Sequence, residues 1–150
     1  MSGQSILKSN CTILFDELKK AVDDYLRRGN IRGDTKYIDA FLAATIHAFI
    51  DYADGYLDQN KNDDEFNACR YANNVLKHNT SLVTHKKIIG GRITFPIHFP
   101  LEFPPIKVIW NYNKSVEVQS KKQQRAFENL FAGKPIIDTL SQLMSKIENI

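Results

Sequence analysis

The fold is decided by residues 38–57, IDAFLAATIHAFIDYADGYL, which form the most apolar stretch of the chain. Its apolar side chains recur at intervals of three and four residues, which is typical of an amphipathic helix. Asp34, a few residues upstream, is the expected N-cap. We predict that this segment is the central helix of a bundle. His47 lies inside the segment and is expected to be a core histidine rather than a catalyst.

Helical periodicity also extends to both sides of this segment. The apolar spacing predicts a helix over residues 5–28, which ends at Gly29-Asn30 and whose start would be capped by Ser5, Ser9 or Asn10. Downstream, the polar stretch at residues 58–62 is too short for anything but a turn, so a third helix at about 63–77 should fold back antiparallel. Three helices are therefore expected within the first eighty residues.

The second half of the chain changes character. Two β-prone runs flank Gly90-Gly91, which indicates a hairpin, and a third run follows at residues 106–112. The chain then returns to helical patterns at about 120–131 and 136–147. We predict a single, mainly α domain over residues 1–150, in which three N-terminal and two C-terminal helices form a bundle. A small β-hairpin or three-strand elaboration occupies about residues 82–112.

Composition narrows the class of protein. The chain has 150 residues, 43% of them hydrophobic, which suits one core better than two. The formal net charge of +3 fits an anionic partner but does not by itself argue for nucleic acid.

Since no apolar run reaches membrane-spanning length and no secretory signal is seen, we expect a soluble, cytoplasmic protein without a membrane partner. Cys11 and Cys69 are expected to be buried thiols.

The polar residues that could carry chemistry lie at the end of the third predicted helix. Arg70, Asn74 and His78 are spaced four apart, so they should form one stripe on the helix surface and project into a common groove. Asn73 and Lys77 lie beside the stripe. Arginine can grip a phosphate with paired donors, and histidine can move a proton near neutral pH. The same residues could equally be structural, with His78 capping a helix end and Arg70 pairing with a neighbouring carboxylate.

The stretch from Arg70 to His78 resembles the motif helix of HEPN domains, small helical bundles found in bacterial defence and toxin systems. Their signature is an Arg, usually followed by a polar residue, and then a His after four to six intervening residues. Asn74 and His78 match the polar residue and the His. Asn73 occupies the place where many members carry Arg. Arg70 is the only nearby Arg, and seven residues lie between it and His78, one more than the usual spacing.

The resemblance implies a metal-independent ribonuclease of a phage-defence or toxin–antitoxin system. Arg70, Asn74 and His78 would be catalytic, and Asn73 and Lys77 would bind the substrate. RNA and a protein are the partners it suggests, and a homodimer is the expected assembly. No cofactor is implied, and no metal-ligand motif is present in the sequence. The alternative is a catalytically inactive HEPN-like protein that recognises a protein partner or RNA.

Overall fold

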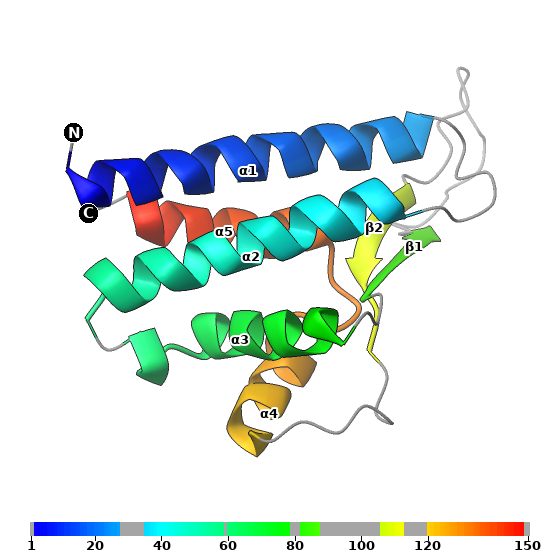
Figure 1. Cartoon of the computed structure of the whole chain (residues 1–150). Coiled ribbons are helices and arrows are strands. Elements are labelled where there is room, and N and C mark those ends of the chain that lie inside the picture. The colour runs from blue at the N-terminus through cyan, green and yellow to red at the C-terminus, as the bar shows by residue number, and fades with distance from the viewer. Residues whose placement is uncertain are drawn as a thin grey trace, which may run out of the picture.

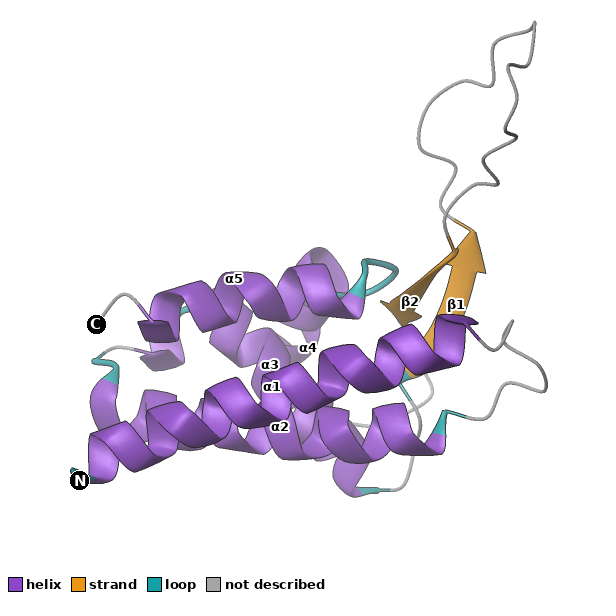
Figure 2. Cartoon of the chain, turned by 90° about the horizontal axis from the view of Figure 1, so that it is seen from above, coloured by secondary structure: helices purple, strands orange, loops and turns teal. Residues whose placement is uncertain are grey.

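A computed structural model describes residues 2–27, 35–58, 60–78, 82–87, 106–112 and 120–148. This part of the chain is mainly helical, as predicted, with a small two-stranded antiparallel sheet (Figures 1 and 2). The elements in chain order are α1 (Gly3–Arg27), α2 (Lys36–Tyr56), the 3-10 turn η2 (Asn60–Asn62), α3 (Asp64–Lys77), β1 (Val83–Lys87), β2 (Ile106–Trp110), α4 (Lys121–Leu130) and α5 (Ile136–Glu148).

The helix α2 lies at the centre of the bundle, where α1, α3 and α5 all contact it (Figure 1). It runs antiparallel to α1, because Gln4 near the start of α1 donates a hydrogen bond of 3.1 Å to Tyr52 near the end of α2. The predicted reversal after α2 is also confirmed, since η2 leads directly into α3. One hydrophobic core draws on every helix and both strands, and its largest fully buried side chain is Trp110.

The details of two helix starts differ from the sequence prediction. The helix α1 already begins at Gly3, so Ser5, Ser9 and Asn10 lie inside it, and the Ser2 hydroxyl accepts from the Ser5 amide instead. Asp34 lies outside the described residues, and Thr35 occupies the N-cap position of α2. The helix α1 thus begins two residues earlier than predicted, and the N-cap of α2 lies one residue later than predicted.

His47 was predicted to lie in the core, and this prediction is wrong. The residue is exposed and forms a 3.3 Å contact with Asp51 one turn later on α2. The central helix is apolar over a wide arc, but its outward face carries Ala40, Ala44, His47 and Asp51, which share one side at helical spacing. High overall apolarity therefore concealed an exposed stripe on this helix.

The small sheet pairs the first and third of the predicted β-prone runs. The strands β1 and β2 are antiparallel, with Val83 opposite Trp110 and Lys87 opposite Ile106. The predicted second run and the Gly90-Gly91 turn lie outside the described residues. The backbone of Trp110 also bonds to the α4–α5 connection, accepting from Gly133 at 2.9 Å and donating to Lys134 at 3.0 Å. The sheet is thereby joined to the bundle rather than forming a separate unit.

The connection between α4 and α5 depends on a glycine. Gly133 has a φ of +76°, a left-handed backbone conformation that glycine adopts without steric cost. The turn brings Phe131 against Trp110, with ring centroids 5.0 Å apart and nearly parallel planes. On α5, the Thr139 hydroxyl accepts a 2.7 Å hydrogen bond from the Trp110 indole, which satisfies the buried N–H. These contacts hold both C-terminal helices against the sheet.

None of the helices in the described ranges is both long enough and apolar enough to span a bilayer.

Candidate functional site

The helix α3, which carries the predicted site, is anchored firmly at its start. The Asp63 side chain caps it by accepting from the amides of Glu65 and Phe66 at 2.9 and 3.4 Å. The Lys146 ammonium on α5 lies 2.7 Å from the second Asp63 oxygen and 3.3 Å from Glu65. Although partial burial alone would lower the pKa of Lys146, its bonds to Asp63 and the nearby Glu65 charge raise the pKa overall.

The predicted stripe lies on the outer ridge of α3, between α2 and α4. Asn74, Lys77 and His78 are exposed, whereas Asn73 is half-buried. The opposite side of the helix packs into the core through residues that are almost fully covered: Ala68, Cys69, Ala72 and Val75. The five predicted site residues lie on the side of α3 away from these core residues, but Arg70 and Asn73 are only partly exposed.

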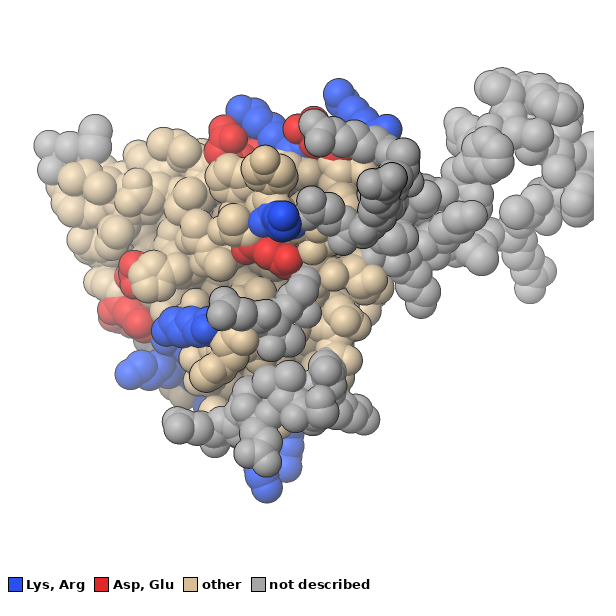
Figure 3. Space-filling view, turned by 45° about the vertical axis from the view of Figure 1, so that its right-hand side comes forward, with Lys and Arg blue, Asp and Glu red and all other residues tan. Residues whose placement is uncertain are grey.

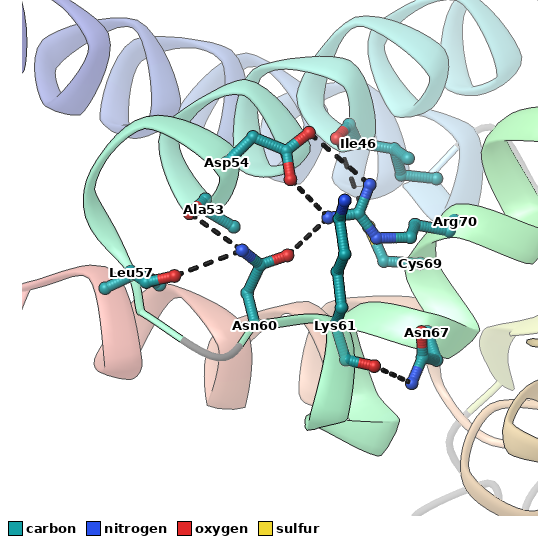
Figure 4. A network of polar contacts seen from close by, with 9 residues as sticks. All are labelled: Ile46, Ala53, Asp54, Leu57, Asn60, Lys61, Asn67, Cys69 and Arg70. Carbon is teal, nitrogen blue, oxygen red and sulfur yellow. Dashed lines mark hydrogen bonds and ion pairs between the residues drawn. The ribbon is translucent and has the colours of Figure 1, made fainter.

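Arg70 does not face open solvent, because its guanidinium is turned toward the end of α2 (Figure 4). One terminal nitrogen, Nη2, lies 2.5 Å from Asp54 Oδ1, and Nη1 donates to Asp54 Oδ2 at 3.4 Å. The same Nη2 donates to the side-chain oxygen of Asn60 in η2. Only 16% of the Arg70 side chain is exposed, compared with 47% for Asp54. We call Asp54, Asn60 and Arg70 the α2–α3 clamp.

Asn60 makes the clamp part of the fold. Its side-chain nitrogen donates to two carbonyls near the end of α2, Ala53 at 3.1 Å and Leu57 at 3.0 Å. The Ala53 carbonyl also accepts from the Leu57 amide at 2.9 Å, whereas the Leu57 carbonyl lies past the last turn of α2, where carbonyls lack a partner within the helix. The Asn60 side chain therefore connects the end of α2 to Arg70 on α3 (Figure 4). This arrangement matches the structural interpretation of Arg70 that the sequence had left open.

Asn74 and His78 have other neighbours. The Asn74 amide donates to Gln123 on α4 over 3.4 Å, a long hydrogen bond on the opposite side of the ridge from Asp54. His78 is the C-cap residue of α3, and its backbone N–H bonds to the Val75 carbonyl at 3.1 Å. Within the described residues, no hydrogen bond or ion pair joins any two of Arg70, Asn74 and His78.

The three side chains therefore do not converge on a common groove. Arg70 and His78 are eight positions apart in the chain, so the helix rise alone places their backbones about 12 Å apart. Arg70 turns toward α2 and Asn74 toward α4, which widens the separation of their polar heads. The spacing of four predicted a shared face correctly, but side-chain direction on that face is set by the neighbouring helices. The catalytic roles of these residues remain predictions.

A second polar cluster, beside α3 and α4, was not recognised from the sequence. The Tyr112 hydroxyl donates to Glu128 and accepts from the Gln124 amide at 2.8 Å. Tyr71 packs against the Tyr112 ring, and its own hydroxyl is buried without a hydrogen-bond partner among the described residues. Burial raises the pKa of Tyr71 to about 12, with smaller contributions from Tyr112 and Glu128. No sequence spacing marks this cluster, because its members come from three separate segments.

The cysteines are buried thiols, as predicted, and are poorly suited to nucleophilic chemistry. Both are fully covered, and the Cys11 thiol lies 3.4 Å from the Ala48 carbonyl. Burial, with a smaller contribution from Asp51, raises the pKa of Cys11 to about 12, and burial likewise raises the pKa of Cys69. Thiolates are the reactive form, so neither sulfur is activated. In the described ranges, no three His, Cys, Asp or Glu side chains gather as metal ligands.

Comparison with known proteins yields no match to a family model, to a curated protein or to a solved structure. The resemblance to HEPN domains therefore depends on residues 70–78 and on the helical pattern around them.

Proposed function

We propose that this chain is a HEPN-like protein of a bacterial defence or toxin system that binds its partner, RNA or another protein, without cleaving RNA. The observation that carries the proposal is the α2–α3 clamp. Arg70, the cation that the resemblance assigns to the scissile phosphate, is already paired with Asp54 and bonded to Asn60.

The chemistry of RNA cleavage explains why this matters. Attack by the ribose hydroxyl builds negative charge on phosphorus, and an enzyme stabilises that charge with cations or donors placed in advance. A guanidinium neutralised by a carboxylate loses most of this ability. Asn73, which stands where many HEPN members carry Arg, offers a neutral amide instead. His78 therefore has no unpaired arginine on its own helix with which to share a phosphate.

The outer ridge of α3 is nevertheless suited to binding. Asn74, Lys77 and His78 present exposed polar groups, with Asn73 half-buried beside them. Amide and imidazole groups both donate and accept hydrogen bonds, and the lysine adds a positive charge. We further propose, from the resemblance, that the chain forms a homodimer with α3 near the interface. Light scattering at micromolar concentration would contradict this if it gave the mass of a monomer.

The test of the proposed function is incubation of RNA with the purified protein in excess chelator, beside His78→Ala and a Lys134→Ala control on an exposed residue of the α4–α5 turn. We expect all three proteins to leave the RNA equally intact. Cleavage by the wild type and the control that disappears in His78→Ala would overturn the proposal. Because His78 is exposed, its loss should leave the fold unchanged, and circular dichroism would verify this.

A ribonuclease is the second candidate, and one feature of the clamp favours it. Asp54 is about half exposed, and the Nε of Arg70 is buried with no hydrogen-bond partner in the described part of the chain. A phosphate could displace Asp54 and take its place on the guanidinium. On this hypothesis, Asp54→Asn would weaken the competing carboxylate and produce cleavage that also requires His78. Absence of cleavage by a folded Asp54→Asn variant would eliminate the candidate.

A further inference from the structure

Five of the lysines and arginines whose side chains are described form an ion pair with a carboxylate. On α1, Lys19 and Lys20 each lie 3.2 Å from an acid one turn earlier. Lys107 of β2 lies 3.4 Å from Asp138, and Lys146 pairs with two acids at the start of α3. Such mixed charges are the usual arrangement of a solvated surface, and they give no reason to expect an anionic partner there.

The outer face of α4 gathers three cations that have no such partner among the described residues. Lys121, Lys122 and Arg125 are all exposed and, at this spacing, share one side of the helix. None of the three forms an ion pair with a described residue. We call them the α4 basic face. In Figure 3, Lys and Arg atoms along the top of the molecule lie against acidic atoms, whereas those at its lowest point, in the region of α4, have no acidic neighbour in this view.

Two contacts join the α4 basic face to the outer ridge of α3. The Lys122 ammonium donates to the Lys61 carbonyl just before α3, over 3.4 Å. The Asn74 amide contacts Gln123, which lies between Lys122 and Arg125 in the sequence. Lys77 follows Asn74 by one turn on α3. The α4 basic face and the outer ridge of α3 therefore adjoin at these two contacts.

The local charges on α4 disfavour the isolated helix. The first turn contains no acidic residue but holds two lysines, next to the positive end of the helix dipole. The only carboxylate in α4, Glu128, accepts from Tyr112 and is not within ion-pair distance of Arg125. Repulsion among these groups would be relieved by an anion, so the arrangement is explained more readily by binding than by stability.

We propose that the α4 basic face binds the phosphate backbone of single-stranded RNA, whose bases then contact the outer ridge of α3. This inference rests on the proposed binding function and names the partner. Protein interfaces are depleted in lysine, whereas lysine and arginine make the phosphate contacts of nucleic-acid complexes. Unpaired bases expose edges that amides can recognise, and Asn73 and Asn74 lie beside the cations. The contact with the backbone should be independent of sequence.

The experiment measures the affinity of a labelled single-stranded RNA of about 20 nucleotides by fluorescence anisotropy, in chelator, over a range of salt. Three full-length proteins are compared: the wild type, Lys121→Gln/Lys122→Gln/Arg125→Gln, and Lys19→Gln/Lys20→Gln/Lys134→Gln. The last variant removes the same charge from exposed residues elsewhere. All six side chains are exposed, so the variants should fold, and thermal unfolding would verify this.

Each phosphate contact with a single strand contributes about 0.7 to the slope of log affinity against log salt. We expect the α4 variant to lose about 2 from that slope, so the advantage of the wild type should shrink about 20-fold between about 50 and about 200 mM salt. The control should keep the slope of the wild type. RNA degradation that is lost in His78→Ala would contradict the proposed function, while the slopes would still decide the role of the α4 basic face.

Two outcomes would overturn the inference and leave the proposed function standing. One is RNA binding that is equally strong and equally salt-dependent in all three proteins. The other is the absence of RNA binding by the wild type, in which case a polyglutamate peptide serves as the probe for a protein partner. Tight binding of that peptide through Lys121, Lys122 and Arg125 would assign the α4 basic face to an acidic protein.

Discussion

The two ends of the outer ridge of α3 differ in what surrounds them. At Arg70 the ridge meets the end of α2, and the side chain is held by Asp54 and Asn60 with 16% of it exposed. Two turns later, Lys77 and His78 are exposed and have no ion pair with a described residue. The residue types resemble one another, yet one end of the ridge joins two helices and the other is open to solvent.

This difference shows that the neighbours of a polar residue, rather than its place in a motif, determine which role it can take. The Asp54 carboxylate on α2 binds the Arg70 guanidinium, so that Arg70 helps to join α2 and α3. Along the outer face of α4, no described residue pairs with the three cations, which leaves them available to a ligand. The predictions below test the contrast between a held end and an open end of the same helix.

The largest effect is expected from Arg70→Ala, which should lower the free energy of unfolding by about 2 kcal/mol. Breaking a buried pair usually costs more, but Asp54 is half exposed and can be rehydrated. The matched variant Lys77→Ala should change stability by less than about 0.5 kcal/mol. Urea unfolding followed by fluorescence of Trp110, the single buried tryptophan, measures both. Equal losses of unfolding free energy in Arg70→Ala and Lys77→Ala would show that Arg70 is held no more firmly than the exposed Lys77.

Asn60→Ala should cost about 1.5 kcal/mol, because it removes two bonds to carbonyls of α2 and one to Arg70. Asn62 lies in the same 3-10 turn but is exposed, so Asn62→Ala is the control and should be nearly neutral. The comparison is made by thermal or urea unfolding. If Asn62→Ala lowered the free energy of unfolding as much as Asn60→Ala does, the loss would come from substitution in the 3-10 turn itself and not from the hydrogen bonds of Asn60.

Tyr71→Phe should be neutral or stabilise the protein by about 0.5 kcal/mol, because it removes a buried hydroxyl that has no hydrogen-bond partner. The variant should also alter the response to alkali. Burial raises the pKa of Tyr71 from 10.0 to about 12, so the unfolded state releases this proton first. The contribution of Tyr71 to stability is thus present below pH 10 and is lost as the pH rises toward 12.

Base titration of the free energy of unfolding measures this effect, with Tyr37→Phe on the exposed face of α2 as the control. The wild type and the control should lose stability more steeply above pH 10 than Tyr71→Phe does. Parallel titration curves for all three proteins would show that the Tyr71 hydroxyl is not isolated from solvent.

Much of the fold could be predicted from the sequence because it depends on local patterns. The periodicity of residues 38–57 and the short polar turn after them dictate a central helix and an antiparallel return. Asp63 followed by two acids is a strong helix start, and Gly133 with Pro135 separates the last two helices. These features act within a few residues, so they need no knowledge of tertiary contacts.

The site was less predictable because it depends on contacts between distant segments. Asp54 precedes Arg70 by 16 residues, and nothing in the spacing says that their side chains meet. Gln123, which contacts Asn74, lies on a helix that the sequence did not connect with the stripe. The sequence analysis did not single out the α4 basic face, since the lack of ion pairs between its cations and the other described residues appears only when the helices are assembled.

The most direct test of the central claim, that Arg70 belongs to the α2–α3 clamp, is a double-mutant cycle on the free energy of unfolding. The cycle compares Asp54→Ala, Arg70→Ala and the double variant with the wild type. If the two side chains hold each other, the double variant should cost about 1 kcal/mol less than the sum of the single variants. Effects that add to within about 0.3 kcal/mol would show that Arg70 is energetically independent of Asp54 and would contradict the account.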